Sequence, residues 1–157
     1  MDYNRRIVLG FLRHIAETRD KQHAGKASAR FLGDSKTTYM GMVGEWDFSM
    51  RTNLPIDLSL RYDGDHGIDF VSEAGTIDVK TYLKPYNLLC EVDKKAADIL
   101  VLAKFSEDGC LFLGWEWSSN MYSKPIRRFH DKGPLNHFKA ADELNKMHSL
   151  YRAIGIQ

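Results

Sequence analysis

The chain has 157 residues, of which 43% are hydrophobic, and its formal net charge at neutral pH is +1. This length predicts a single domain that is large enough to bury a core. No apolar run approaches the roughly 20 residues that a membrane-spanning helix needs. The N-terminal residues also lack the order of a secretory signal, because Arg13 and His14 interrupt the first apolar stretch. We therefore expect a cytoplasmic protein, with Cys90 and Cys110 as reduced, buried thiols.

Two helices are predicted in the first third of the chain. Apolar residues recur at helical spacing over Asn4–Thr18, which predicts an amphipathic helix. Of its apolar side chains we expect Ile7, Phe11 and Ile15 to pack on the rest of the domain. The polar and basic stretch Lys21–Lys36 reads as a connector. Thr37 or Thr38 can cap a second helix, which we expect to run to about Thr52.

Short apolar runs separated by turn residues predict six strands after these helices. The strands are expected at about Asp57–Tyr62, Gly67–Ser72, Thr76–Leu83, Asn87–Val92, Asp98–Phe105 and Cys110–Trp115. The C-terminal stretch Leu135–Ile154 is predicted to be mostly helical. Helices before and after a run of strands predict an α+β fold with a mixed central β-sheet flanked by helices.

The most informative stretch is the hairpin predicted around a Glu-Ala-Gly turn. Because side chains alternate along a strand, Asp78 and Lys80 share one face, and Asp69 on the partner strand is placed to oppose Asp78. Like charges that face each other across a sheet are destabilising. A divalent cation such as Mg²⁺, which prefers oxygen ligands, would relieve this repulsion. The alternative is that both aspartates are solvated residues on an exposed face.

These residues resemble the core of the PD-(D/E)XK nuclease superfamily. The resemblance is carried by Gly67-Ile68-Asp69 and by Ile77-Asp78-Val79-Lys80. In that family the two acidic residues bind Mg²⁺ and the lysine assists catalysis. The stretch Gly44-Glu45-Trp46-Asp47-Phe48 resembles the family's preceding helix, so Glu45 matches the helical glutamate of many members. One departure is that Ile68 stands where the family often has proline.

The resemblance covers about residues 37–152 and leaves residues 1–36 unaccounted for. It extends to Ala97-Asp98-Ile99-Leu100-Val101-Leu102 and to Gly133-Pro134-Leu135-Asn136-His137, which are similar to later segments of small phage and prokaryotic members. It implies a restriction-endonuclease-like fold in one domain, residues 1–157. Residues 1–36 then form a basic N-terminal helical extension. The expected setting is the cytoplasm of a prokaryotic or phage-infected cell.

The family match also implies a division of roles at the site. Asp69, Asp78 and Glu45 would hold Mg²⁺ or Mn²⁺, and the backbone carbonyl of Val79 would add an oxygen ligand. The cation would polarise a phosphate and lower the pKa of a bound water. Lys80 would orient that water and offset the negative charge that develops during hydrolysis. Without the family match, Glu45 would be interpreted as an exposed helix residue.

The charge distribution agrees with a nucleic-acid substrate. Residues 1–36 carry a net charge of +4, residues 37–80 a net charge of −5 and residues 81–157 a net charge of +2. An acidic centre can collect cations while flanking Lys and Arg side chains contact phosphates. Lys94, Lys95, Arg127 and Arg128 are the predicted DNA-contacting residues. A solvated surface remains the alternative explanation for each cluster.

Two functional classes remain open on the sequence. The first is a Mg²⁺-dependent deoxyribonuclease, and the second is a non-catalytic nucleic-acid-binding or protein-interaction module on the same fold. The complete set of Asp69, Asp78, Lys80 and Glu45 favours the enzyme. The sequence does not distinguish internal from terminal cleavage, or DNA from RNA. It also leaves open whether the chain forms a homodimer.

Overall fold

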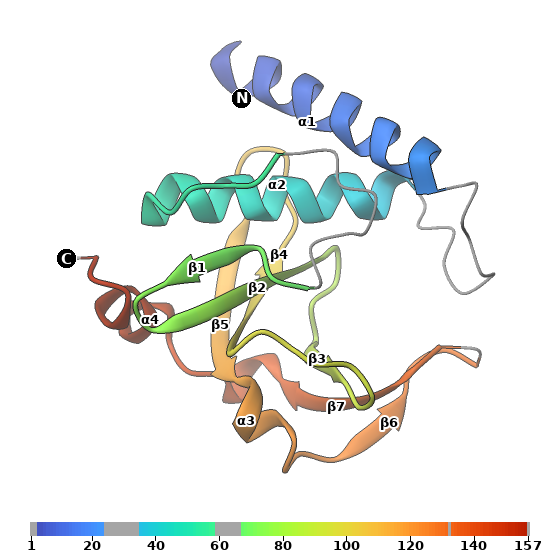
Figure 1. Cartoon of the computed structure of the whole chain (residues 1–157), viewed down its shortest axis with the longest axis vertical. Helices are drawn as coiled ribbons and strands as arrows, with labels where there is room; N and C mark the ends of the chain where they lie inside the picture. Colours follow the sequence, from blue (N-terminus) through green and yellow to red (C-terminus); the bar gives the residue numbers. More distant parts are fainter. Residues whose placement is uncertain (1–2, 24–34, 59–66, 132, 157) are drawn as a thin grey trace.

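The computed structural model of this chain describes residues 3–23, 35–58, 67–131 and 133–156 (Figure 1). Its helices are α1 (Tyr3–His23), α2 (Ser35–Thr52), α3 (Ser118–Met121) and α4 (Met147–Ala153), with a 3₁₀ turn at Ala141–Glu143. Its strands are β1 (Phe70–Ser72), β2 (Gly75–Tyr82), β3 (Asn87–Glu91), β4 (Ile99–Lys104), β5 (Leu111–Trp117), β6 (Ile126–Arg128) and β7 (Leu135–Ala140). The fold is therefore α+β, as the sequence predicted.

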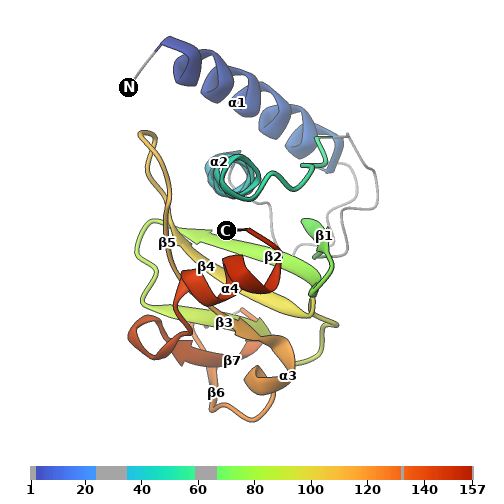
Figure 2. The same cartoon turned by 90° about the vertical axis from the view of Figure 1, so that its left-hand side faces the viewer.

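The strands form two sheets. The first sheet has the order β1-β2-β4-β5, in which β2 and β4 are parallel and the other neighbours are antiparallel. The second sheet has the order β3-β7-β6 and is antiparallel throughout. Figure 2 shows the layers in succession: α1, then α2, then the first sheet, then the second sheet. The first sheet is thus covered on both faces, on one by helices and on the other by strands.

Helix α2 packs directly on β2. Val43 and Phe48 of the helix belong to the same buried cluster as Ile77 and Val79 of the strand. The approach is closest at Gly44, where a Cβ atom would lie 1.9 Å from Thr81 Oγ1. No real Cβ can occupy that position, so glycine permits this helix–strand distance. The unfavourable helix propensity of glycine is offset here by close packing.

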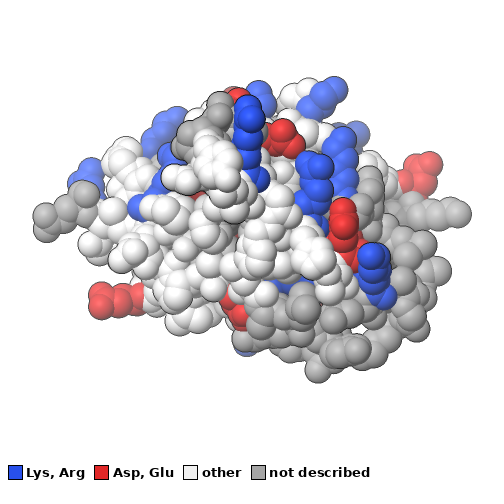
Figure 3. All heavy atoms as spheres, turned by 90° about the horizontal axis from the view of Figure 1, so that it is seen from above, with Lys and Arg blue, Asp and Glu red and all other residues white. Residues whose placement is uncertain are grey.

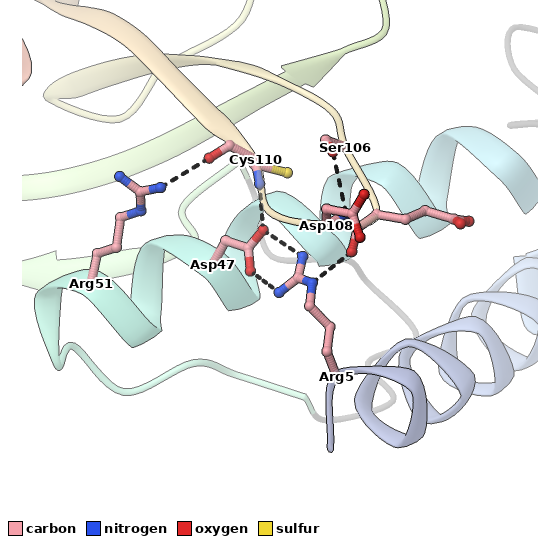
Figure 4. Close-up of polar contacts among 7 residues, drawn as sticks. Arg5, Asp47, Arg51, Ser106, Asp108 and Cys110 are labelled. Carbon is pink, nitrogen blue, oxygen red and sulfur yellow. Dashed lines mark hydrogen bonds and ion pairs between the residues drawn. The ribbon is translucent and has the colours of Figure 1, made fainter. Parts of the chain in front are cut away.

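Helix α1 lies outside α2 and is fixed to it by packing and by one buried ion pair. Leu9, Leu12, Ile15 and Ala16 are buried in the same core cluster. The Arg5 guanidinium forms a bidentate pair with Asp47 of α2, with contacts of 2.5 and 2.9 Å (Figure 4). The first helix is therefore an integral layer of the domain.

The predicted packing of α1 was only partly right. Ile15 is buried, but Ile7 is 55% exposed and Phe11 is 52% exposed. These two residues share a face with Tyr3 through i, i+4 spacing, and that face points away from α2. Figure 3 views the molecule from this side and shows an uncharged central area that is bordered by side chains of both charges. The prediction failed because the apolar residues of this helix are spread over more than one face.

A second core cluster fills the space between the two sheets. Leu100 and Leu102 of β4 meet Leu88 and Cys90 of β3 there. Strand alternation explains this, because the neighbouring residues of β4 point to α2 instead. Cys90 and Cys110 are both free and buried, as expected.

The C-terminal third differs most from the sequence prediction. Leu135–Ile154 was predicted to be mostly helical, but its first six residues form β7, in which Asn136 and His137 are buried. Only Met147–Ala153 is α-helical in that stretch. The strand is specified by its pairing with β3, which is distant in the sequence, and with the three-residue strand β6. Elements α3 and β6 were not predicted at all.

The remaining boundaries agree to within a few residues. Helix α1 continues to His23 and α2 begins at Ser35, so the predicted connector Lys21–Lys36 is shorter, and residues 24–34 lie outside the described part. A strand was predicted at Asp57–Tyr62. Asp57 and Leu58 are not in a strand, and residues 59–62 lie outside the described ranges. Among the described helices, none is long and apolar enough to cross a membrane.

Candidate functional site

The β1–β2 hairpin brings the two predicted acidic residues together. Phe70 pairs with Ile77, so continuing this antiparallel register places Asp69 opposite Asp78. The backbone N–H of Asp69 donates a hydrogen bond of 2.9 Å to the carbonyl of Ile77, which continues the ladder past the end of β1. Gly67 precedes this point with a φ of +75°, a conformation that favours glycine. The hairpin geometry therefore matches the register that the sequence suggested.

Asp78 and Lys80 form an ion pair on the face of β2 that points away from α2. Lys80 Nζ lies 2.5 Å from Asp78 Oδ2, and the exposed fractions of the two side chains are 33% and 9%. The neighbouring residues Ile77 and Val79 belong to the α2-side core. The expected alternation is present, with apolar side chains on one face and charged side chains on the other.

The protonation state of Lys80 follows from this environment. Burial alone would lower its pKa, but the charge of Asp78 and the hydrogen bond to it outweigh burial, and Asp69 adds a smaller contribution. The net result is a pKa above the ordinary value for lysine. Lys80 is therefore an ammonium group at neutral pH. In this ion pair it can donate hydrogen bonds and offset negative charge.

Asp69 is held by the backbone of β2. Its Oδ2 atom accepts a hydrogen bond of 2.6 Å from the backbone N–H of Val79. The N–H and C=O groups of successive residues point to opposite edges of a strand, so those of Ile77 and Val79, two residues apart, point to the same edge of β2. The Val79 carbonyl thus points toward the edge where Asp69 lies. Asp69 and the Val79 carbonyl thus share this edge, and the Asp78 side chain lies on the adjoining face of the strand.

A cleft of about 720 Å³ opens over this face of β2. Its floor includes Asp78, Lys80 and Tyr82, and its far wall is formed by residues between β6 and β7. Its charged lining residues are Asp78, Lys80, Glu91, Lys94 and Lys95. Cys90 also lines the cleft, but burial raises the pKa of its thiol, which disfavours a thiolate nucleophile. The chemistry of the cleft is that of fixed charges and hydrogen-bond donors.

Two of the four predicted DNA-contacting residues lie in this cleft. Lys94 and Lys95 line it, and a Cβ at Gly67 would be 3.8 Å from both Lys94 Nζ and Asp78 Oδ2. Arg127 and Arg128 lie on β6, exposed, and do not line the cleft. Arg128 donates a hydrogen bond to the carbonyl of Gly133, which does line it. The two arginines thus contact residues of the far wall without lining the cleft themselves.

Glu45 occupies a different layer of the structure. It is half-buried on α2, one residue after the Gly44 contact with Thr81, whereas Asp78 and Lys80 point into the cleft on the opposite face. It is not among the residues that line the cleft. Within the described ranges, no three His, Cys, Asp or Glu side chains are grouped as a metal site would require. The structure thus places Asp78 and Lys80 in the cleft, and Asp69 and Val79 beside them on the hairpin but not among the residues that line it. Glu45 lies in a different layer.

A further buried charge pair, between Lys139 and Glu116, has no signal in the sequence. Lys139 of β7 lies 2.5 Å from Glu116 of β5, and Glu116 also accepts hydrogen bonds from the Asn120 and Asn145 side chains. Burial would raise the pKa of Glu116, but these hydrogen bonds, led by that from Lys139, lower it below its ordinary value. Both oxygens of this carboxylate thus accept hydrogen bonds from within the fold. The network joins the two sheets and is structural.

Comparison of the chain with protein-family models, with curated protein sequences and with solved structures gives no match. The function of the chain is therefore inferred from the chemistry of the cleft and from Asp78 and Lys80 at its floor.

Proposed function

We propose that this protein is a metal-dependent nuclease of the PD-(D/E)XK type, with a restriction-endonuclease-like core, which hydrolyses phosphodiester bonds in DNA. The observation that carries the proposal is the Asp78–Lys80 pair at the floor of the cleft, with Asp69 opposite Asp78 across the hairpin. A carboxylate paired with a lysine at the floor of a cleft that carries further lysines, with a second carboxylate beside it on the hairpin, is suited to a phosphate substrate.

The donor set fits a small, hard cation. Asp69, Asp78 and the Val79 carbonyl are all oxygen donors, and Mg²⁺ is commonly held by one or two carboxylates together with waters and substrate phosphates. When bound, Mg²⁺ or Mn²⁺ would neutralise phosphate charge and lower the pKa of a water molecule. Glu45 remains a proposed further ligand, whose participation requires movement of α2 relative to β2 or a bridging water.

The chain's own residues supply the rest of the mechanism. Lys80 balances the charge of Asp78 before substrate arrives, and it is close enough to transfer its hydrogen bonds to a phosphate oxygen or to the attacking water. Lys94 and Lys95 at the rim contact neighbouring phosphates. As an ammonium group, Lys80 would stabilise developing negative charge, and the water's proton would leave to another acceptor such as solvent or a phosphate oxygen.

A second candidate function is a nucleic-acid-binding module that does not cut. The observation that favours it is that Asp78 is already paired with Lys80 and that Asp69 accepts a hydrogen bond from the Val79 N–H, so both carboxylates have partners within the protein. In that case Lys94 and Lys95 would bind phosphates and the ion pair would be structural. This alternative predicts binding that is independent of divalent cations.

The experiment that separates the two candidates is a cleavage assay. Purified protein is incubated with linear, circular and single-stranded DNA in Mg²⁺, in Mn²⁺ and in EDTA. The nuclease proposal predicts cleavage with either cation and none in EDTA, and the circular substrate reports whether cuts are internal. DNA binding without cleavage under every condition would favour the binding module.

Metal binding can be measured without substrate. We expect Mn²⁺ at millimolar concentration to raise the melting temperature of the wild-type protein, because a ligand that binds only the folded state stabilises it. Asp78→Asn should lose this increase. If wild type melts at the same temperature with and without Mn²⁺, the carboxylate pair is not a metal site.

A further inference from the structure

We infer that the cleft receives a single unpaired DNA strand, with one base placed against Phe129, so that the preferred substrates are single strands, overhangs or flaps. This inference rests on the proposed function for the identity of the ligand. It goes further in naming the form of DNA and the residue that selects it.

The two sides of the cleft differ in chemistry. The floor and one rim carry Lys80, Lys94 and Lys95, which suit phosphates. The opposite wall carries Phe129, His130 and Pro134, which present rings rather than charges. A single strand has the same division, with phosphates along one side and base faces along the other. Its phosphates can lie on the lysines while a base lies on the ring wall.

Phe129 is held in place before any ligand arrives. Its ring packs edge-to-face on Phe138 of β7, with centroids 5.6 Å apart and an interplanar angle of 84°. The Arg127 guanidinium lies 5.7 Å from the Phe129 ring centroid. Phe129 is nevertheless only half-buried and still lines the cleft. A fixed, partly open aromatic ring is the usual platform for an unpaired base.

The size of the cleft favours one strand over two. Its volume of about 720 Å³ lies within the range of pockets that enclose small molecules, which is roughly 300–1,000 Å³. One or two nucleotides fill such a space, whereas a base in a duplex must first leave its stack at an energetic cost. An unpaired base pays no such cost. The cleft therefore discriminates between paired and unpaired DNA at the point of entry.

The test measures binding without cleavage. Fluorescence anisotropy is recorded in EDTA for a labelled 12-nucleotide single strand and for the same strand in a duplex. We expect wild type to bind the single strand several-fold more tightly, and Phe129→Ala to weaken single-strand binding about tenfold, as removal of one stacking ring does. Duplex affinity should change little in this variant, because no base of the duplex reaches Phe129.

Two further variants make the result specific to the ring. Phe129→Trp should keep the preference because it retains an aromatic face, and Phe129→Leu should lose it although it retains apolar bulk. Tyr86→Ala is the matched control, because Tyr86 is an exposed aromatic residue that does not line the cleft. The affinity of Tyr86→Ala for the single strand should equal that of wild type. Melting curves verify that each variant is folded, and the Trp and Leu variants carry the test if the Ala variant is not.

The outcomes separate this inference from the nuclease proposal. Equal affinity of wild type for single strand and duplex, or full affinity of Phe129→Ala and Phe129→Leu, would overturn the inference even if the protein cuts DNA. Conversely, a single-strand preference that depends on the Phe129 ring would support the inference in a protein that cuts nothing, and the nuclease proposal alone would then fail.

Discussion

The two faces of β2 are built from the same strand but obey different constraints. On the α2 face, Ile77 and Val79 are buried and Thr81 approaches Gly44 so closely that no side chain fits between them. On the opposite face, Asp78 and Lys80 lie at the floor of an open cleft and are paired with each other. Period-two alternation puts a closed core and a candidate site on one strand.

This contrast teaches where substitutions should affect stability and where they should affect function. The closed face has fixed geometry, so changes there should be measured in the free energy of unfolding. On the cleft face, two charged side chains are partly buried, which costs desolvation free energy. Their ion pair offsets part of this cost. An apolar pair at these two positions would serve folding as well.

The largest stability effect is expected where α1 is tied to the closed side. Arg5→Met removes the bidentate partner of Asp47, which is 7% exposed and otherwise accepts a hydrogen bond from the Cys110 N–H. Leaving this carboxylate without its countercharge should cost about 3 kcal/mol of unfolding free energy. Urea denaturation measures it. Arg6→Met, at the neighbouring exposed position, is the control, and equal stability of the two variants would contradict the assignment.

A smaller loss is expected at the α2–β2 contact. Gly44→Ala places a methyl group against Thr81 and should destabilise the protein by about 1–3 kcal/mol, because the helix must move away from the sheet. Thr81→Ala removes the obstructing hydroxyl and methyl, so the double variant should recover part of the loss. Purely additive effects in the double-variant cycle would show that the two residues do not meet.

The neighbouring helix glycine should respond with the opposite sign. A Cβ at Gly41 would meet its nearest atom, Glu45 Oε1, at 3.9 Å, which is an ordinary contact. Gly41→Ala should therefore stabilise the protein by up to about 1 kcal/mol through helix propensity. Thermal denaturation compares it with Gly44→Ala. Destabilisation by both variants would mean that α2 cannot tolerate any side chain along this stretch.

The smallest effect concerns acid stability through Glu116. Its pKa is lower in the folded protein than its ordinary value, so its contribution is fully present above the unfolded value of about 4.3 and declines as pH falls through the folded value. Unfolding free energy should therefore decrease as pH falls from 5 to 3. Glu116→Gln should be less stable at neutral pH but lose less stability over this interval. Parallel pH curves for both proteins would contradict the assigned pKa direction.

Much of the closed side could be predicted from sequence. Helical spacing located α1 and α2, and strand alternation separated Asp78 from Ile77 correctly. Helical spacing did not predict which face of α1 is buried. Ile7 and Phe11 fit an amphipathic helix, yet they lie on its exposed face. The face of a helix that is buried depends on its partner helix, and the Arg5–Asp47 pair that sets this joins residues far apart in sequence.

The cleft was predictable on one side only. The hairpin is local, so its register and its charged residues could be inferred from a short motif. The far wall depends on β7, which pairs with the distant β3 and whose sequence predicted a helix, and on β6, which was not predicted. Phe129 was missed for this reason. Glu45 was placed on the correct helix, but a helix position does not specify which face of a sheet the side chain can reach.

The measurement that tests the central proposal most directly is the cleavage rate of Lys80→Ala in Mg²⁺, compared with wild type and with Lys84→Ala. Lys84 is an exposed lysine just beyond the end of β2 and does not line the cleft, so its loss removes the same charge at a nearby position. We predict wild-type cleavage for Lys84→Ala and a loss of at least about 100-fold for Lys80→Ala. Cleavage by Lys80→Ala at the wild-type rate would contradict the proposal that the Asp78–Lys80 pair performs the hydrolysis.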